Sequence, residues 1–233
     1  YEMLRSLVGS EMCIRDRYFK LSVGLPIASF SLIDGGYGQA ANYYRKIEVN
    51  GKYSIVGRYP IADNMAKKVN CYHFIYNEKG KIAKVEYLRG GKLWDDPYFG
   101  VARVIIEYSE EYEKWIFQDA KGNPKANVDR VYSISLKLNE NNYPISLFNY
   151  DKKGRLVENK DGVAQYLWTL DEKGQRIKSI GINKRGYRIV DDNGHYELRF
   201  KYDKRGNVIE QSNHGKEGQL LEDNYNIAII RFK

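Results

Sequence analysis

The chain has 233 residues, of which 42% are hydrophobic and 14% aromatic, and its formal net charge is +8 at pH 7. Its 21 tyrosines argue against an extended disordered chain, because disordered chains are poor in aromatic residues. Lysine and arginine alternate with acidic neighbours and form no basic run, so the charge indicates a solvated surface and argues against a nucleic-acid partner.

Residues 1–17 differ in composition from the rest of the chain. The run LVGSEMCIRDR at residues 7–17 resembles a translated sequencing adapter, so we expect residues 1–17 to be non-native. Cys71 is then the one native cysteine, which excludes a disulfide framework and a cysteine-based metal site.

Residues 18–40 have the three parts of a secretory signal peptide. Lys20 is basic, residues 21–33 are mostly apolar, and Gly38 and Ala40 are small residues at the positions that a signal peptidase reads. The apolar run is too short to span a bilayer as a helix, so we expect no transmembrane segment. The pattern predicts export, either secretion or delivery to the periplasm and cell envelope. A first β-strand followed by a glycine-rich turn is the alternative interpretation.

Residues 41–76 predict an N-terminal β-hairpin region. Asn50-Gly51 stands between two apolar runs, which is a signal for a tight hairpin turn. Tyr72, Phe74 and Tyr76 alternate with other residues and form a partial first copy of the repeat that follows.

Residues 77–233 contain turn motifs that recur at a constant spacing along the chain, which predicts a repeat architecture. The first turn set is Asn77 to Gly80, NENN at Asn139, Asp171 to Gly174 and Asp203 to Gly206. The second turn set is Asp119 to Gly122, Asp151 to Gly154, Asn183 to Gly186 and GKEG at Gly215. Asp or Asn at the first position bonds its own backbone, and Gly at the fourth accepts a positive φ, so we expect four-residue hairpin connections.

The segments before the first-set turns alternate strictly between apolar and polar residues. Tyr166, Trp168 and Leu170 share one face of such a segment, whereas Glu197 and Arg199 belong to the polar face of the next. This period of two is typical of half-buried antiparallel strands. The sequence therefore predicts an all-β fold, an antiparallel meander of 32-residue β-hairpin repeats that form a twisted, solenoid-like sheet.

The phrases YDKKG at Tyr150 and YDKRG at Tyr202 resemble the YD repeats of bacterial Rhs-type proteins and related β-hairpin repeats of exported bacterial proteins. The similarity covers residues from about 70 to 233 and is specific at the turns. It implies a secreted or envelope-associated scaffold and transfers no catalytic residue. Five units are too few to enclose a cargo.

No pattern in the chain predicts a catalytic, cofactor-binding or metal site. His73, His195 and His214 have no partner at metal-ligand spacing, and we expect them to be surface residues. The stretch Asp191 to Gly194 lacks the ligand spacing of a calcium-binding loop, so it predicts an ordinary turn.

Exposed aromatic residues are the remaining candidates for ligand contact. Trp94, Asp95, Asp96 and Tyr98 form a loop composition typical of sites that hold sugars or peptides by stacking and hydrogen bonds. The alternative is that Trp94 caps the end of a core.

Two classes of function follow from these patterns. The first is a monomeric, non-enzymatic binding or scaffold protein that contacts an extracellular or envelope protein or a glycan. The second is the repeat carrier of a longer toxin-like effector or enzyme, with its active domain beyond residue 233. Weak binding to acidic polymers through the net positive charge is a third option.

Overall fold

The computed structural model describes residues 42–50 and 52–232, so the expected adapter segment (1–17) and signal peptide (18–40) lie outside the described residues. The regular secondary structure of the described part is almost entirely β-strand, and its one helix is α2 at Asp63–Ala66. The strands are β1 (Tyr43–Val49), β2 (Ile55–Ile61), β3 (Cys71–Tyr76), β4 (Ile82–Arg89), β5 (Lys92–Leu93), β6 (Arg103–Tyr108), β7 (Tyr112–Gln118), β8 (Ser133–Leu138), β9 (Pro144–Tyr150), β10 (Gln165–Leu170), β11 (Arg176–Ile182), β12 (Arg188–Ile189), β13 (Glu197–Tyr202), β14 (Val208–His214) and β15 (Ile229–Arg231).

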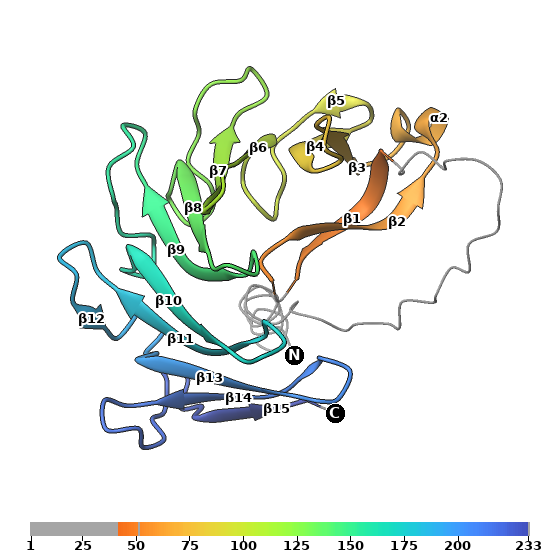
Figure 1. The fold of residues 1–233 in the computed structure, drawn as a ribbon. Coiled ribbons are helices and arrows are strands. Elements are labelled where there is room, and N and C mark those ends of the chain that lie inside the picture. Colours follow the sequence, from red (N-terminus) through yellow and green to blue (C-terminus); the bar gives the residue numbers. More distant parts are fainter. Residues whose placement is uncertain (1–41, 51, 233) are drawn as a thin grey trace, which may run out of the picture.

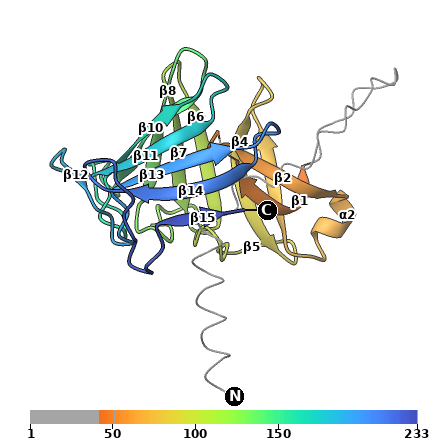
Figure 2. The same cartoon turned by 90° about the horizontal axis from the view of Figure 1, so that it is seen from below.

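All these strands belong to one 15-stranded antiparallel sheet, in which β3 to β15 follow one another in chain order. β1 lies between β2 and β3, and the short strands β5 and β12 pair beside the main path with β4 and β11. The sheet bends round into an open arc, with β1 and β2 near one end and β13 to β15 at the other (Figure 1). Turned by 90°, β10, β11, β13 and β14 run side by side across one side of the molecule (Figure 2). The predicted all-β meander is confirmed.

Alternate side chains of each strand point to the inside of the arc and form the core. Trp115 and Phe117 on β7 are each 1% exposed, and Leu198 and Phe200 on β13 are each 8% exposed. Lys201 lies on the opposite face of β13 and is exposed. The two-residue period of a strand therefore places one apolar column inside and one polar column outside.

The outer face of the sheet is held by ion pairs. The buried carboxylate of Glu197 lies 2.7 Å from both Arg188 Nη2 and Arg199 Nε, and 3.3 Å from Lys178 Nζ. Burial alone would raise the pKa of Glu197, but hydrogen bonds from these three basic side chains lower it to about 2. The carboxylate is therefore ionised at any physiological pH.

The turns share one hydrogen-bond pattern, which Asp171 illustrates. Its Oδ1 accepts the backbone N–H groups of Lys173 (3.0 Å) and Gln175 (2.8 Å), and Asp171 N donates to Gln175 O (2.9 Å). Two Oδ1 bonds of the same kind form at Asn50, Asn77, Asp119, Asn127, Asn139, Asp151, Asn159, Asn183, Asp191, Asp203 and Asp223. The loop thus has three residues inside a closing pair, with a positive-φ residue as the last of the three.

The turn at Asn50 differs from the tight two-residue turn that Asn50-Gly51 predicts. Asn50 Oδ1 accepts the N–H groups of Lys52 and Ser54, so the turn extends to Ser54. Tyr53 then takes the positive φ of 57° that glycine supplies in most other turns. The Tyr53 ring lies against Trp115 and Trp168.

Two glycines of these turns separate the cost of backbone strain from the cost of steric overlap, because both have positive φ but different surroundings. A Cβ at Gly186 (φ +84°) would meet nothing within 4 Å, whereas one at Gly174 (φ +77°) would lie 2.5 Å from the Tyr143 ring. We expect Gly186→Ala to lower the free energy of unfolding by about 1 kcal/mol through backbone strain alone. Gly174→Ala should lower it by about 2–3 kcal/mol, because the Tyr143 ring must also move. Urea denaturation measures both, and equal losses would contradict the close packing at Gly174.

Candidate ligand-binding cavity

A cavity of about 220 Å³ lies on the inside of the arc. Its lining runs from Val49 at the end of β1 to Phe200 on β13, so it gathers residues that are far apart in the chain. One part of the lining is aromatic and another is polar and charged. Such a combination is typical of small-molecule sites, which pair apolar walls with a few convergent polar groups.

The small side chain of Ser179 explains why there is a cavity at this place. Trp115, Leu147 and Ser179 are spaced 32 residues apart, on β7, β9 and β11, and all line the cavity. Ser179 pairs with Trp168 on β10 and Leu198 on β13. Because a serine stands where the equivalent strands carry tryptophan and leucine, space remains beside Trp168.

The aromatic wall joins segments that are far apart in the sequence. The Tyr53 ring, from the β1–β2 turn, lies 5.5 Å from the Trp115 ring and 5.3 Å from the Trp168 ring, measured between centroids. These tilted contacts have the spacing of favourable aromatic pairs. Burial raises the pKa of Tyr53 well above its ordinary value, so its hydroxyl stays protonated.

The indole N–H groups of the two cavity tryptophans differ. Trp115 Nε1 donates to Glu113 Oε1 at 2.6 Å. Trp168 is 8% exposed, and its Nε1 is buried without a hydrogen-bond partner. The guanidinium carbon of Arg176 lies 5.1 Å from the Trp168 ring centroid and 5.0 Å from that of Phe200. A buried donor without an acceptor is rare in folded proteins and calls for an explanation.

The polar wall consists of stacked turns, which we call the third turn set. The four turns of this set begin at Asn127, Asn159, Asp191 and Asp223. In each step, the second residue of a turn donates its backbone N–H to a carbonyl of the preceding loop. The donor and acceptor pairs are Val128 to Phe99 (3.0 Å), Lys160 to Asp129 (3.0 Å), Asp192 to Asp161 (3.1 Å) and Asn224 to Asn193 (3.0 Å). These turns recur at the same period as the two predicted sets, but the sequence interpretation did not recognise them as a set.

Acidic and basic side chains alternate along the third turn set. Lys160 Nζ lies 3.1 Å from Asp161 Oδ1 and 3.5 Å from Asp129 Oδ1, and all three residues line the cavity. Beside them, Asn159 Nδ2 donates to the Tyr166 hydroxyl at 3.2 Å. Burial raises the pKa of Tyr166, so this hydroxyl also stays protonated.

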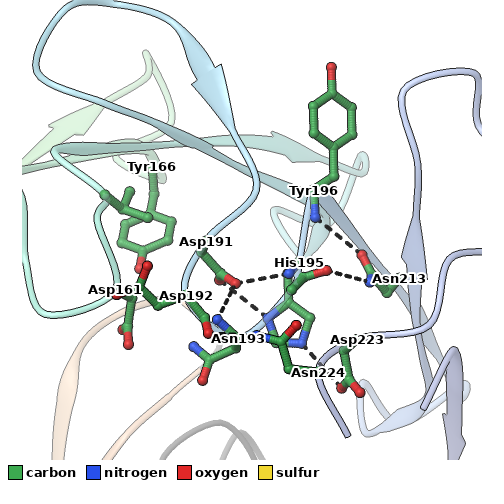
Figure 3. A network of polar contacts seen from close by, with 12 residues as sticks. Asp161, Tyr166, Asp191, Asp192, Asn193, His195, Tyr196, Asn213, Asp223 and Asn224 are labelled. Atoms are coloured by element: carbon green, nitrogen blue, oxygen red, sulfur yellow. Dashed lines mark hydrogen bonds and ion pairs between the residues drawn. The ribbon is translucent and has the colours of Figure 1, made fainter. Parts of the chain in front are cut away.

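His195 lies between the turns that begin at Asp191 and Asp223 (Figure 3). Its Nδ1 is 3.2 Å from Asp191 Oδ2 and its Nε2 is 3.6 Å from Asp223 Oδ2. The His195 side chain is only 12% exposed, which differs from the surface position that the sequence predicts. The reason is stacking, because the turn that carries Asp223 folds back over the turn that carries Asp191, as the Asn224 to Asn193 bond shows.

These two carboxylates control the protonation of His195. Burial by itself would lower the pKa of His195, but the hydrogen bond to Asp191 and the charges of Asp191 and Asp223 raise it above the ordinary value. The His195 ring therefore bridges two successive turns. Since Asp191 also lines the cavity, the bridge fixes one part of the cavity wall.

The loop that the sequence singles out lies partly at the cavity. Tyr98 lines it, whereas Trp94 is 56% exposed, does not line it, and stacks on the Arg89 guanidinium at 5.6 Å. Asp95 pairs with Lys125. Asp96 is 2% exposed, and its carboxylate accepts the N–H groups of Tyr98 and Phe99 and the hydroxyl of Tyr72. It therefore holds the loop in shape, although burial raises its pKa.

Metal ions and membranes are two other kinds of partner to consider. Among residues 42–50 and 52–232, no group of three or more His, Cys, Asp and Glu side chains is arranged to hold a metal ion. No helix in the same part of the chain is long and apolar enough to cross a membrane.

No protein-family model matches the chain, and no curated protein matches it. The functional argument therefore depends on the geometry of the cavity.

The His195 bridge predicts how stability depends on pH. A histidine whose pKa is raised by folding stabilises the protein below its unfolded-state pKa of about 6.5, and this contribution is lost as pH rises through the folded-state pKa. We expect His195→Gln to lower the free energy of unfolding by about 1–2 kcal/mol at pH 6, and by less at pH 9. Urea denaturation across this range measures the difference.

A matched variant tests whether the carboxylates are the cause. Asp223→Asn keeps a side chain that forms the same turn at Asn127 and Asn159 but removes one charge beside His195. It should reduce the pH dependence. The same pH dependence in His195→Gln as in the natural chain would contradict the bridge.

Proposed function

We propose that this chain is a non-enzymatic binding module, and that its ligand occupies the cavity inside the arc. The observation that carries the proposal is the cavity beside Trp168, which joins an aromatic wall to a wall of polar and charged side chains. A ligand with an apolar face and polar substituents would match both walls.

The state of the cavity carboxylates supports binding rather than catalysis. Asp191 Oδ1 accepts two backbone N–H groups of its own turn, and its Oδ2 faces His195. Asp161 is paired with Lys160. General acid–base catalysis needs a carboxyl or imidazole that reaches the reacting group. Here these groups hold the turns in place and form a rigid wall.

We also propose that the module acts outside the cytoplasm, as a monomer in contact with an envelope or extracellular glycan or peptide. The signal-like pattern of residues 18–40 and the likeness of the turns to YD-type repeats support this placement. In this proposal the sheet is the scaffold, and it consists of 32-residue units that each add strands to the arc.

Isothermal titration calorimetry with small disaccharides and tripeptides tests the binding proposal. The decisive variant is Ser179→Leu, which gives β11 the residue that β9 carries at Leu147 and fills the space beside Trp168. We expect the natural chain to bind at least one probe and Ser179→Leu to lose that binding. Its thermal unfolding should occur at the same or a higher temperature, because a cavity is filled.

A second variant separates the cavity from the exposed loop. Trp94→Phe changes the exposed tryptophan and leaves the cavity lining intact. Binding that is lost in Trp94→Phe and kept in Ser179→Leu would move the site to the loop. Absence of binding to every probe by the natural chain would contradict the proposed function.

A further inference from the structure

Basic side chains gather on the outer face of the sheet over β11 to β15, where β11, β13 and β14 run side by side (Figure 2). Apart from His214 and from Arg176, which lines the cavity, the charged residues of these strands are five cations and two carboxylates. They leave an excess of three positive charges, and we call this set the basic face. Its members are Lys178, Arg188, Glu197, Arg199, Lys201, Glu210 and Arg231.

The two carboxylates of the basic face are already paired. Glu197 binds three of the basic side chains, as described above. Glu210 lies 2.8 Å from Lys201 Nζ and 2.9 Å from Arg231 Nε, and hydrogen bonds from these two bases lower its pKa. Both carboxylates are therefore ionised, and the excess of positive charge persists at physiological pH.

The stability of the sheet does not explain this excess. Lys178 on β11 and Arg199 on β13 are directly opposite each other in the strand register. Like charges in that position destabilise a sheet. Bases also outnumber the carboxylate in the clusters around Glu48 (Lys46 and Arg58) and Glu86 (Lys84 and Arg103) on other strands. A ligand that brings negative charge would relieve the repulsion.

The cations of the basic face can reach such a ligand. The side chains of Lys201 and Arg231 are 70% and 71% exposed, and that of Arg199 is 41% exposed. Arg199 and Arg231 pair with the glutamates through Nε, and a guanidinium has further N–H donors. The ion pairs with Glu197 and Glu210 show that these side chains bind carboxylate groups in this arrangement.

The strands place the cations at regular intervals. Lys201, Glu210 and Arg231 form one row across β13, β14 and β15, and neighbouring strands are about 4.8 Å apart. A polymer with carboxylates fixed at a constant interval can contact several cations at once, so its weak contacts add up.

Two other polyanions fit the basic face less well. Single-stranded nucleic acid needs aromatic side chains on which its bases stack. The outward side chains of β11 and β13 include Lys178, Ile180, Glu197, Arg199 and Lys201, and none is aromatic. A membrane surface is flat, whereas the outer face of the arc is convex (Figure 1).

We infer that the basic face binds an acidic polysaccharide through the carboxylate groups of its sugars. This second surface lies on the side of the sheet opposite to the cavity, so the inference is independent of the cavity ligand.

Fluorescence anisotropy with a labelled hexamer of galacturonic acid tests the inference. The methyl ester of the same hexamer is the matched ligand, because it keeps the sugars and removes their charge. We expect saturable binding of the acid and none of the ester. Raising NaCl from about 50 mM to about 300 mM should weaken the binding, since salt screens exposed charges.

Paired variants locate the site. Lys178→Gln combined with Lys201→Gln should weaken binding about 3–10-fold, the effect of losing two exposed ion pairs. The control combines Lys152→Gln with Lys153→Gln, which removes the same charge from an exposed turn and should leave the affinity unchanged.

A second variant adds net positive charge to the face without removing a cation. Glu210→Gln releases Lys201 and Arg231 and should tighten binding about 2–5-fold. Glu140→Gln, in another exposed turn, is its control and should have no effect.

Equal binding of the acid and the ester, or equal losses in the two lysine variants, would overturn the inference. Tighter binding of hexaglutamate or of a single-stranded hexanucleotide would overturn the assignment to a polysaccharide. Ser179→Leu fills the cavity and should keep the hexamer bound. Loss of the hexamer in that variant would place it in the cavity and overturn the basic face, whereas no binding of the hexamer by the natural chain would overturn the basic face alone.

Discussion

The structure depends on one repeated interaction, in which the side-chain oxygen of an Asp or Asn accepts two backbone N–H groups of its own turn. In the Asp171 turn these bonds reach Lys173 and Gln175, and Gly174 supplies the positive φ. The side chain replaces the water that the turn backbone would otherwise bind, so the chain reverses within a single short turn. Since the same reversal follows most long strands, successive strands remain antiparallel and present the same face to the inside of the arc.

The cavity results from an interruption in this regular arrangement. The third turn set stacks by backbone hydrogen bonds, and several of its side chains line the cavity. Tyr53 reaches the same space from the β1–β2 turn, so one end of the sheet contacts the middle strands β7 and β10 at Trp115 and Trp168. Ser179 leaves open the space that Leu147 fills two strands earlier. A scaffold made of nearly equivalent strands thus becomes specific through a few side chains that differ from their counterparts.

The sequence predicts the fold class because the signals for strands and turns are local. The alternation around Leu198 and Phe200 and the Asp-x-x-Gly turns depend on residues that are close in the chain, and the meander follows from them. The cavity depends instead on contacts over long distances, such as Tyr53 with Trp168, and on how far the sheet bends. The third turn set was within reach, because Asn127, Asn159, Asp191 and Asp223 recur at the same period as the predicted turns. Its recognition would have shown that His195 lies between stacked turns. Nothing local shows that Trp168 Nε1 lacks a partner.

The most direct test of the account is a nuclear magnetic resonance spectrum of the tryptophan side chains in ¹⁵N-labelled Trp94→Phe protein. The indole N–H signals that remain belong to Trp115 and Trp168, because the chain has three tryptophans. Space remains beside the Trp168 ring, where Ser179 pairs with it, so a ligand that binds in calorimetry should shift the Trp168 signal more than the Trp115 signal. A Trp168 signal that stays unchanged at saturating ligand would contradict the claim that this cavity is the binding site.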